Sequence, residues 1–110
     1  MIRVKAERDD QGRIRTVTVK GHAGAGPYGF DLVCAGVSAV SVGTVNAIEA
    51  LCGFDPLIDI AADGGYLRCG LTDQVSDPGA REKAELLLEG MLVALKTIEN
   101  TYGEHIKVTD

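Results

Sequence analysis

The chain is poor in cysteine, with three in 110 residues, and that number is odd. Small secreted domains usually carry an even number of cysteines paired in a disulfide framework. The first residues, Ile2-Arg3-Val4-Lys5, also lack the apolar stretch and small-residue cleavage site of a secretory signal. We therefore expect a cytoplasmic protein whose cysteines are reduced thiols.

Long hydrophobic runs and excess positive charge are also missing. The longest stretch without a charged residue, 32–48, contains Ser38, Ser41, Thr44 and Asn46, and falls short of the roughly 20 predominantly apolar residues that cross a membrane. The chain has 11 Lys and Arg against 16 Asp and Glu, for a net charge of −5. Nucleic-acid binding relies on clustered Lys and Arg. We expect no membrane and no direct nucleic-acid partner, and a basic protein suits this charge better.

What the sequence does contain is typical of a globular protein, with 45% hydrophobic and 25% charged residues. A chain of 110 residues fits a single core. It has no low-complexity segment or internal linker. We predict one domain over residues 1–110.

The first half predicts a hairpin followed by a helix. Apolar and polar residues alternate over 2–6 and again up to Lys20, with a turn at 9–12 between them. Residues 32–52 are apolar or small on nearly every face and contain no proline, and Gly53 suits the end of a helix.

The second half repeats that pattern more loosely. Runs with strand character at 57–62 and 66–71 flank the turn signal Asp63-Gly64-Gly65. Asp77-Pro78 predicts the start of an amphipathic helix that ends near Tyr102-Gly103, and Ile106 and Val108 predict an edge strand.

The resulting order, β-β-α-β-β-α-β, predicts an α+β fold. A two-layer sandwich, with two helices on one face of a mostly antiparallel sheet, accommodates it most simply. A helix as apolar all round as 32–52 must be covered on more than one side. Burial between the sheet and the second helix is one explanation. Burial against a second subunit is the other, and we favour this homodimer packed through helices.

One histidine and one cysteine stand at opposite ends of a glycine-studded loop. Gly21, Gly24, Gly26 and Gly29 allow the backbone to turn sharply enough to bring His22 back over Cys34. Cys34 is the candidate nucleophile, and His22 is the candidate base and acid. A small buried hydrophobe is the plain alternative for Cys34.

Asp31 is well placed to cap the helix, which leaves Cys34 in the first turn. The N–H groups there stabilise a thiolate. We expect the free backbone N–H groups around Cys34 and Ala35, with Ala35 as the main candidate, to act as oxyanion donors. Asp31 is also a candidate orienting residue.

The remaining candidates have simpler interpretations. Gly24 to Gly29 match G-x-G-x-x-G, but Pro27 removes an N–H and the chain is short for a doubly wound sheet, so we discount a dinucleotide site. Cys52 and Cys69 are expected in or near the core and lack metal-ligand spacing. His105 has no partner in the sequence. We expect no metal and no cofactor.

The motifs G-H-A-G, G-x-D and V-C-A-G-V-S-A, at residues 21–24, 29–31 and 33–39, resemble those of the ribosomal-processing cysteine protease family, Prp. The resemblance covers essentially the whole chain and implies the catalytic pair His22 and Cys34. It implies that Asp31 matches an acidic position of the family, and that the loop Ala23 to Phe30, with its glycines, is mobile. It also implies a homodimer.

Members of this family remove a short N-terminal extension from large-subunit ribosomal protein twenty-seven, after an aromatic-rich motif. The resemblance thus implies a specific cysteine endopeptidase with a basic ribosomal-protein substrate. The alternative is a ribosome-associated binding module that recognises the same N-terminus without cutting it.

Overall fold

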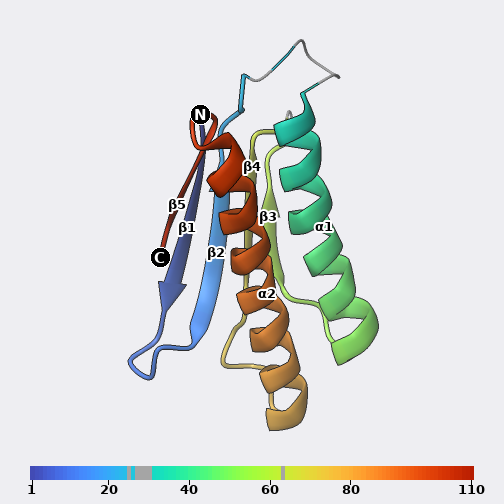
Figure 1. Cartoon of the computed structure of the whole chain (residues 1–110). Helices are drawn as coiled ribbons and strands as arrows, with labels where there is room; N and C mark the ends of the chain where they lie inside the picture. Colours follow the sequence, from blue (N-terminus) through green and yellow to red (C-terminus); the bar gives the residue numbers. More distant parts are fainter. Residues whose placement is uncertain (25, 27–30, 63) are drawn as a thin grey trace.

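A computed structural model describes residues 1–24, 26, 31–62 and 64–110. Both helices lie on one face of a five-stranded sheet (Figure 1). This confirms the predicted α+β fold and its element order. The elements are β1 (Ile2–Arg8), β2 (Ile14–Lys20), α1 (Leu32–Cys52), β3 (Leu57–Ile60), β4 (Tyr66–Gly70), α2 (Pro78–Tyr102) and β5 (Ile106–Thr109).

The sheet has the strand order β3-β4-β2-β1-β5. Three of its strand pairs are antiparallel, and the edge pair β1 and β5 is parallel. The parallel pair arises because α2 carries the chain from β4 to the opposite edge of the sheet. This crossover places the segment before β5 beside the start of β1, since Ile2 lies opposite Ile106.

The core lies between the sheet and the helices. Alternate residues of the central strands face the helices, so Val4 lies opposite Val19 and both are buried. Helix α1 contributes one buried face with helical spacing, formed by Val33, Val37, Ser41, Val45 and Ile48. Helix α2 contributes Ala84, Leu88, Met91, Leu92 and Leu95.

The helix ends follow the predicted signals. Asp77 caps α2 by accepting from the N–H groups of Gly79 and Ala80. Helix α1 is followed by Gly53 in the left-handed conformation, with φ 76°. Fixed ends matter here because each residue of helical shift rotates a side chain by about 100°.

Much of the apolar surface of helix α1 is not covered by the rest of the chain. By length and composition it is apolar enough to cross a membrane, so the expectation that this run falls short was wrong on that measure. Only 28% of its most apolar stretch is buried, and Leu32 and Leu51 are 77% and 69% exposed. Burial between the sheet and α2 therefore does not account for the apolar breadth of α1.

A charged cluster ties the far end of the sheet to α2. The Arg8 guanidinium donates to the Asp110 carboxylate at 2.7 Å and to Glu89 at 2.5 Å. Hydrogen bonding from Arg8 is the main cause that lowers the pKa of Asp110 to about 2. The ionised form of Asp110 is thus favoured in the folded protein.

We predict that Asp110→Asn lowers the free energy of unfolding at neutral pH by at most about 1 kcal/mol, because the pair is partly exposed and screened by solvent. A pKa lowered by folding contributes stability above the unfolded value of 3.8, and this is lost as pH falls toward about 2. Urea unfolding at pH 7 and pH 2 measures this. An equal gap between variant and wild type at both pH values would contradict it. Asp73→Asn is the matched control, since that carboxylate pairs with Arg15 but is 85% exposed.

Candidate active site

His22 follows the point where the chain leaves the sheet. Gly21 has φ 100°, and an added Cβ would clash with the Met1 carbonyl oxygen, so this position requires glycine. The Gly21 N–H donates to the Gly65 carbonyl at 2.7 Å, which fixes the departure of the chain from β2. Gly24 also has a positive φ. Gly29 and much of the predicted mobile loop lie outside the described residues.

Cys34 lies in the first turn of α1, as the sequence predicts. One carboxylate oxygen of Asp31 accepts from the N–H groups of Val33 and Cys34, both at 3.0 Å. This cap sets where the helix begins, and therefore the direction in which Cys34 points. Cys34 is half-buried, unlike Cys69, which has no exposed surface.

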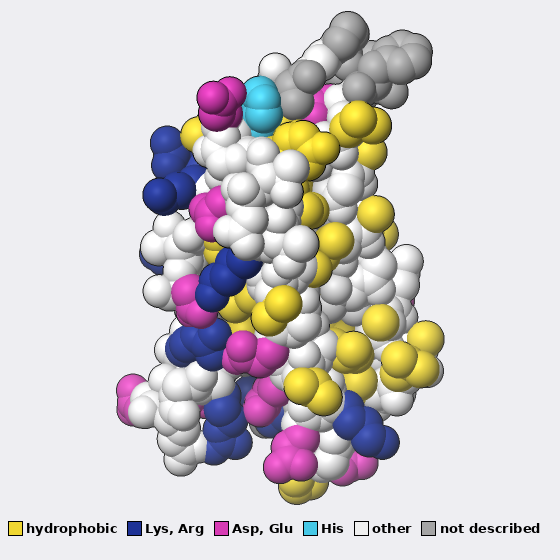
Figure 2. All heavy atoms as spheres, in the orientation of Figure 1, with side chains coloured by type: hydrophobic (Ala, Val, Ile, Leu, Met, Phe, Trp, Pro, Cys, Tyr) yellow, Lys and Arg dark blue, Asp and Glu magenta, His cyan; other side chains and the backbone are white. Residues whose placement is uncertain are grey.

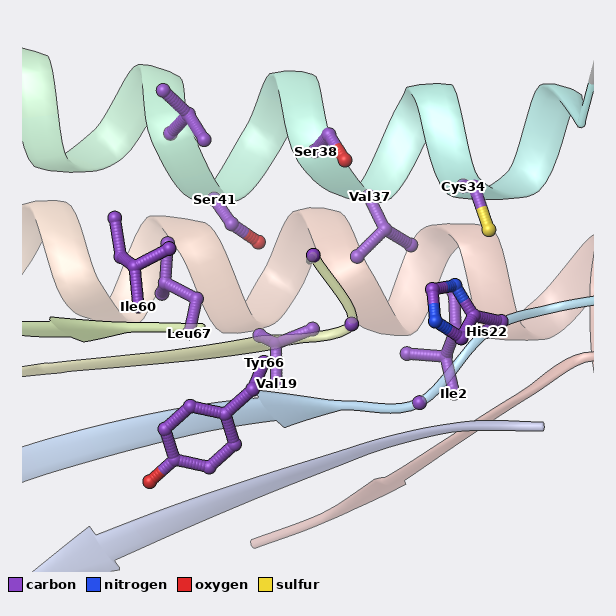
Figure 3. Close-up of a pocket in the computed structure, with 14 residues that line it drawn as sticks. Ile2, Val19, His22, Cys34, Val37, Ser38, Ser41, Ile60, Tyr66 and Leu67 are labelled. Atoms are coloured by element: carbon purple, nitrogen blue, oxygen red, sulfur yellow. The ribbon is translucent and has the colours of Figure 1, made fainter. Parts of the chain in front are cut away.

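The fold brings His22 and Cys34 together. Their side chains point toward one another across the same cavity (Figure 3). The Ala23 N–H donates to the Cys34 sulfur at 3.3 Å. A backbone N–H directed at sulfur stabilises a thiolate over a thiol. The arrangement suits a thiol nucleophile with an imidazole beside it.

The cavity holds about 310 Å³ between α1 and the sheet. Most of its lining is apolar, but the Ser41 hydroxyl is buried and has no hydrogen-bond partner among the described residues. Such a cavity fits an apolar side chain with one polar atom. Its lining residues are Ile2, Val19, Gly21, His22, Cys34, Val37, Ser38, Ser41, Val42, Ile60, Gly64, Gly65, Tyr66 and Leu67.

The expectation of free N–H groups at Cys34 and Ala35 was wrong. The Cys34 N–H donates to the Asp31 carboxylate, and the Ala35 N–H donates to the Asp31 carbonyl at 3.0 Å. The reason is helix geometry, since the fourth helical N–H bonds the carbonyl of the capping residue. Of the described backbone donors, the Ala23 N–H is instead directed at the sulfur.

The other candidates fall as follows. Burial, with a smaller contribution from the charge of Glu49, raises the pKa of Cys69 to about 11, so this thiol stays protonated at neutral pH. Cys52 is half-buried at the far end of α1. Within the described part of the chain, no three His, Cys, Asp or Glu side chains could hold a metal ion.

Sequence reasoning missed His105. The sequence shows no partner for it and predicts a surface or edge-strand residue, yet its Nδ1 lies 3.0 Å from the Ala23 carbonyl oxygen. The amino nitrogen of Met1 likewise donates to the His22 carbonyl at 2.6 Å. No signal in the sequence links these residues to the site, because strand pairing alone brings them there.

The sequence profile described as "Cysteine protease Prp" matches residues 1–107. The chain belongs to the Prp family of cysteine proteases. It is therefore a cysteine peptidase, and the resemblance seen in its motifs is confirmed. The ribosomal processing cysteine protease Prp of Bacillus subtilis is 47% identical over 109 residues, which cover 99% of this chain and 96% of the relative.

Two solved structures of Prp from S. aureus resemble this one closely. The first, in complex with a covalently linked product peptide, has a TM-score of 0.88 and 41% identity. The second, with a substrate peptide, has a TM-score of 0.82 and 39% identity. Each alignment covers 99% of this chain and 98% of the other.

We predict that Gly65→Ala reduces proteolysis far more than Gly64→Ala does. Both residues have positive φ, 76° and 79°, so both substitutions strain the backbone similarly. Only at Gly65 would the new Cβ meet the His22 ring, 2.6 Å from Nε2. Peptide cleavage and thermal unfolding, measured together, separate the two effects. Similar losses of activity in both variants would contradict the prediction.

Proposed function

We propose that this protein is a cytoplasmic endopeptidase that removes the N-terminal extension of large-subunit ribosomal protein twenty-seven, with Cys34 as nucleophile and His22 as base and acid. The main support for this proposal is that the His22 and Cys34 side chains line one cavity and that the Ala23 N–H donates to the Cys34 sulfur. Membership of the Prp family supports the same pair.

Acylation begins when the Cys34 thiol gives its proton to His22. The sulfur then attacks the scissile carbonyl carbon, a C–S bond forms, and the carbonyl oxygen becomes an oxyanion. The Ala23 N–H donates to the sulfur before attack and is therefore a candidate to donate to that oxygen. His22 returns its proton to the departing amine as the C–N bond breaks, leaving a thioester.

Deacylation repeats these roles with water. His22 takes a proton from the water molecule as the water oxygen attacks the thioester carbonyl carbon. The C–S bond then breaks, the acid product leaves, and the thiol regains its proton. The covalently linked product peptide in the S. aureus relative fits a nucleophilic route of this kind.

The substrate follows from the relatives and from the chemistry of the cavity. The B. subtilis and S. aureus relatives are ribosomal processing proteases, and one of the S. aureus structures holds a substrate peptide. The mostly apolar lining suits apolar side chains before the cut. The net charge of −5 favours encounter with a basic ribosomal protein.

We predict that wild-type protein cuts a peptide spanning the N-terminal extension of the host's own ribosomal protein twenty-seven once, and that Cys34→Ala does not cut it. Removing the nucleophile lowers the rate by a factor on the order of 10³ or more. Mass spectrometry of the products measures both. Cleavage by Cys34→Ala at the wild-type rate would contradict the assignment of Cys34 as the nucleophile.

Iodoacetamide provides an independent control. An activated Cys34 is alkylated near neutral pH, whereas Cys69 stays unreactive because burial keeps its thiol protonated. Binding of the peptide without cleavage, together with an inert Cys34, would favour the alternative function, a binding module.

We also propose that the protein acts as a homodimer packed through its helices. Hydrophobic side chains gather on the face over α1 and α2 (Figure 2), and Leu86 and Val93 of α2 are 72% and 65% exposed. A shallow groove between the helices is lined by Val40, Gly43, Thr44, Ala47, Leu86, Leu87, Gly90, Met91 and Ala94. Contiguous apolar surface of this kind is typical of a subunit contact.

We predict that Leu86→Glu or Val93→Glu converts the dimer to a monomer, because each places a charge in an apolar contact. Stability of the subunit should change little, since both side chains are exposed within one chain. Sedimentation velocity measures the association state. Leu57→Glu on β3, at a residue 46% exposed, is the matched control and should stay dimeric. A wild-type monomer would contradict the proposal.

A further inference from the structure

His105 is anchored in the turn between α2 and β5. Its N–H donates to the Tyr102 carbonyl and its own carbonyl accepts from the Ile2 N–H, both at 2.8 Å. The half-buried ring then reaches across to Ala23, placing Nδ1 3.0 Å from the carbonyl oxygen. A carbonyl oxygen only accepts, so Nδ1 carries the hydrogen in this contact.

Ala23 is held through both of its flanking peptide groups. The Ala23 N–H and the His22 carbonyl belong to one peptide plane. Met1 nitrogen donates to that carbonyl, while the N–H donates to the Cys34 sulfur. The carbonyl of the next plane accepts from His105. Because peptide groups are planar, fixing both planes fixes the two backbone dihedrals of Ala23.

We infer that His105 is a positioning residue for the peptidase reaction, which keeps the Ala23 N–H directed at the Cys34 sulfur. A hydrogen bond weakens steeply as its angle departs from linear, so a freely turning peptide would lose this contact. The thiolate is the reactive form, and the directed N–H stabilises it. The inference rests on the proposed role of Cys34 as nucleophile.

This role concerns the nucleophile rather than substrate binding. His105 does not line the cavity described above, and its side chain contacts the site through the backbone of Ala23, while its backbone contact with Ile2 is kept in any variant. Losing the contact should therefore lower kcat and leave KM unchanged. It should also slow alkylation of Cys34 when no substrate is present.

The test compares wild type with His105→Asn and His105→Leu. The side-chain nitrogen of Asn is attached to Cγ, as Nδ1 of His is, so Asn keeps a donor at the same position. Leu has the branching of Asn without a donor. We measure kcat and KM on the ribosomal-protein peptide, the rate of iodoacetamide alkylation of Cys34 without peptide, and thermal unfolding.

We expect His105→Leu to lower both kcat and the alkylation rate by roughly tenfold, the loss of about one hydrogen bond. His105→Asn should restore most of both rates. Equal rates in the Asn and Leu variants, whether both normal or both low, would overturn the inference. If the Leu variant does not fold, His105→Asp takes its place, because a carboxylate has the same shape as Asn but only accepts.

Failure of the proposed function is distinguishable from failure of this inference. If Cys34→Ala still cleaves the peptide, the nucleophile is wrong. If Cys34 is essential and the His105 variants all match wild type, only the positioning role fails.

Discussion

The two hydrogen bonds that the Asp31 carboxylate accepts from the first turn of α1 govern the geometry of the site. They determine that the helix begins at Leu32, so Cys34 falls on the side of the helix that faces the end of β2. A start one residue later would rotate the sulfur by about 100° around the helix axis. The position of the sulfur in the cavity, its approach to His22 and its hydrogen bond from Ala23 all depend on this orientation of Cys34 around the helix axis.

The fold followed from local signals, whereas much of the site did not. Alternation in the hairpins, the caps at Asp31 and Asp77, and Gly53 after α1 predicted the element bounds closely, because each acts within a few residues. The contact of His105 with Ala23 spans 82 positions and depends on the parallel pairing of β1 with β5. The hydrogen bond from the Ala35 N–H to the Asp31 carbonyl could have been predicted from helix geometry alone, because only the first helical N–H groups lack a carbonyl partner.

Helix α1 serves two purposes on opposite sides. Its inner face, with Val37 and Ser41, forms a wall of the cavity beside the nucleophile. Its outer side, with Leu32, has little cover within the chain. The same rigid element thus connects the proposed chemistry with the proposed subunit contact, so a partner that shifts α1 also shifts Cys34.

The crossover of α2 has a consequence for how this enzyme is made. Met1, Ala23 and Cys34 are synthesised and leave the ribosome before His105 and β5 do. Contacts between such distant positions form only when the intervening chain is available. A partly synthesised chain therefore contains Cys34 but lacks the His105 contact that holds the Ala23 peptide. On the proposed role of His105, Cys34 gains its full reactivity only after β5 has been synthesised and has paired with β1.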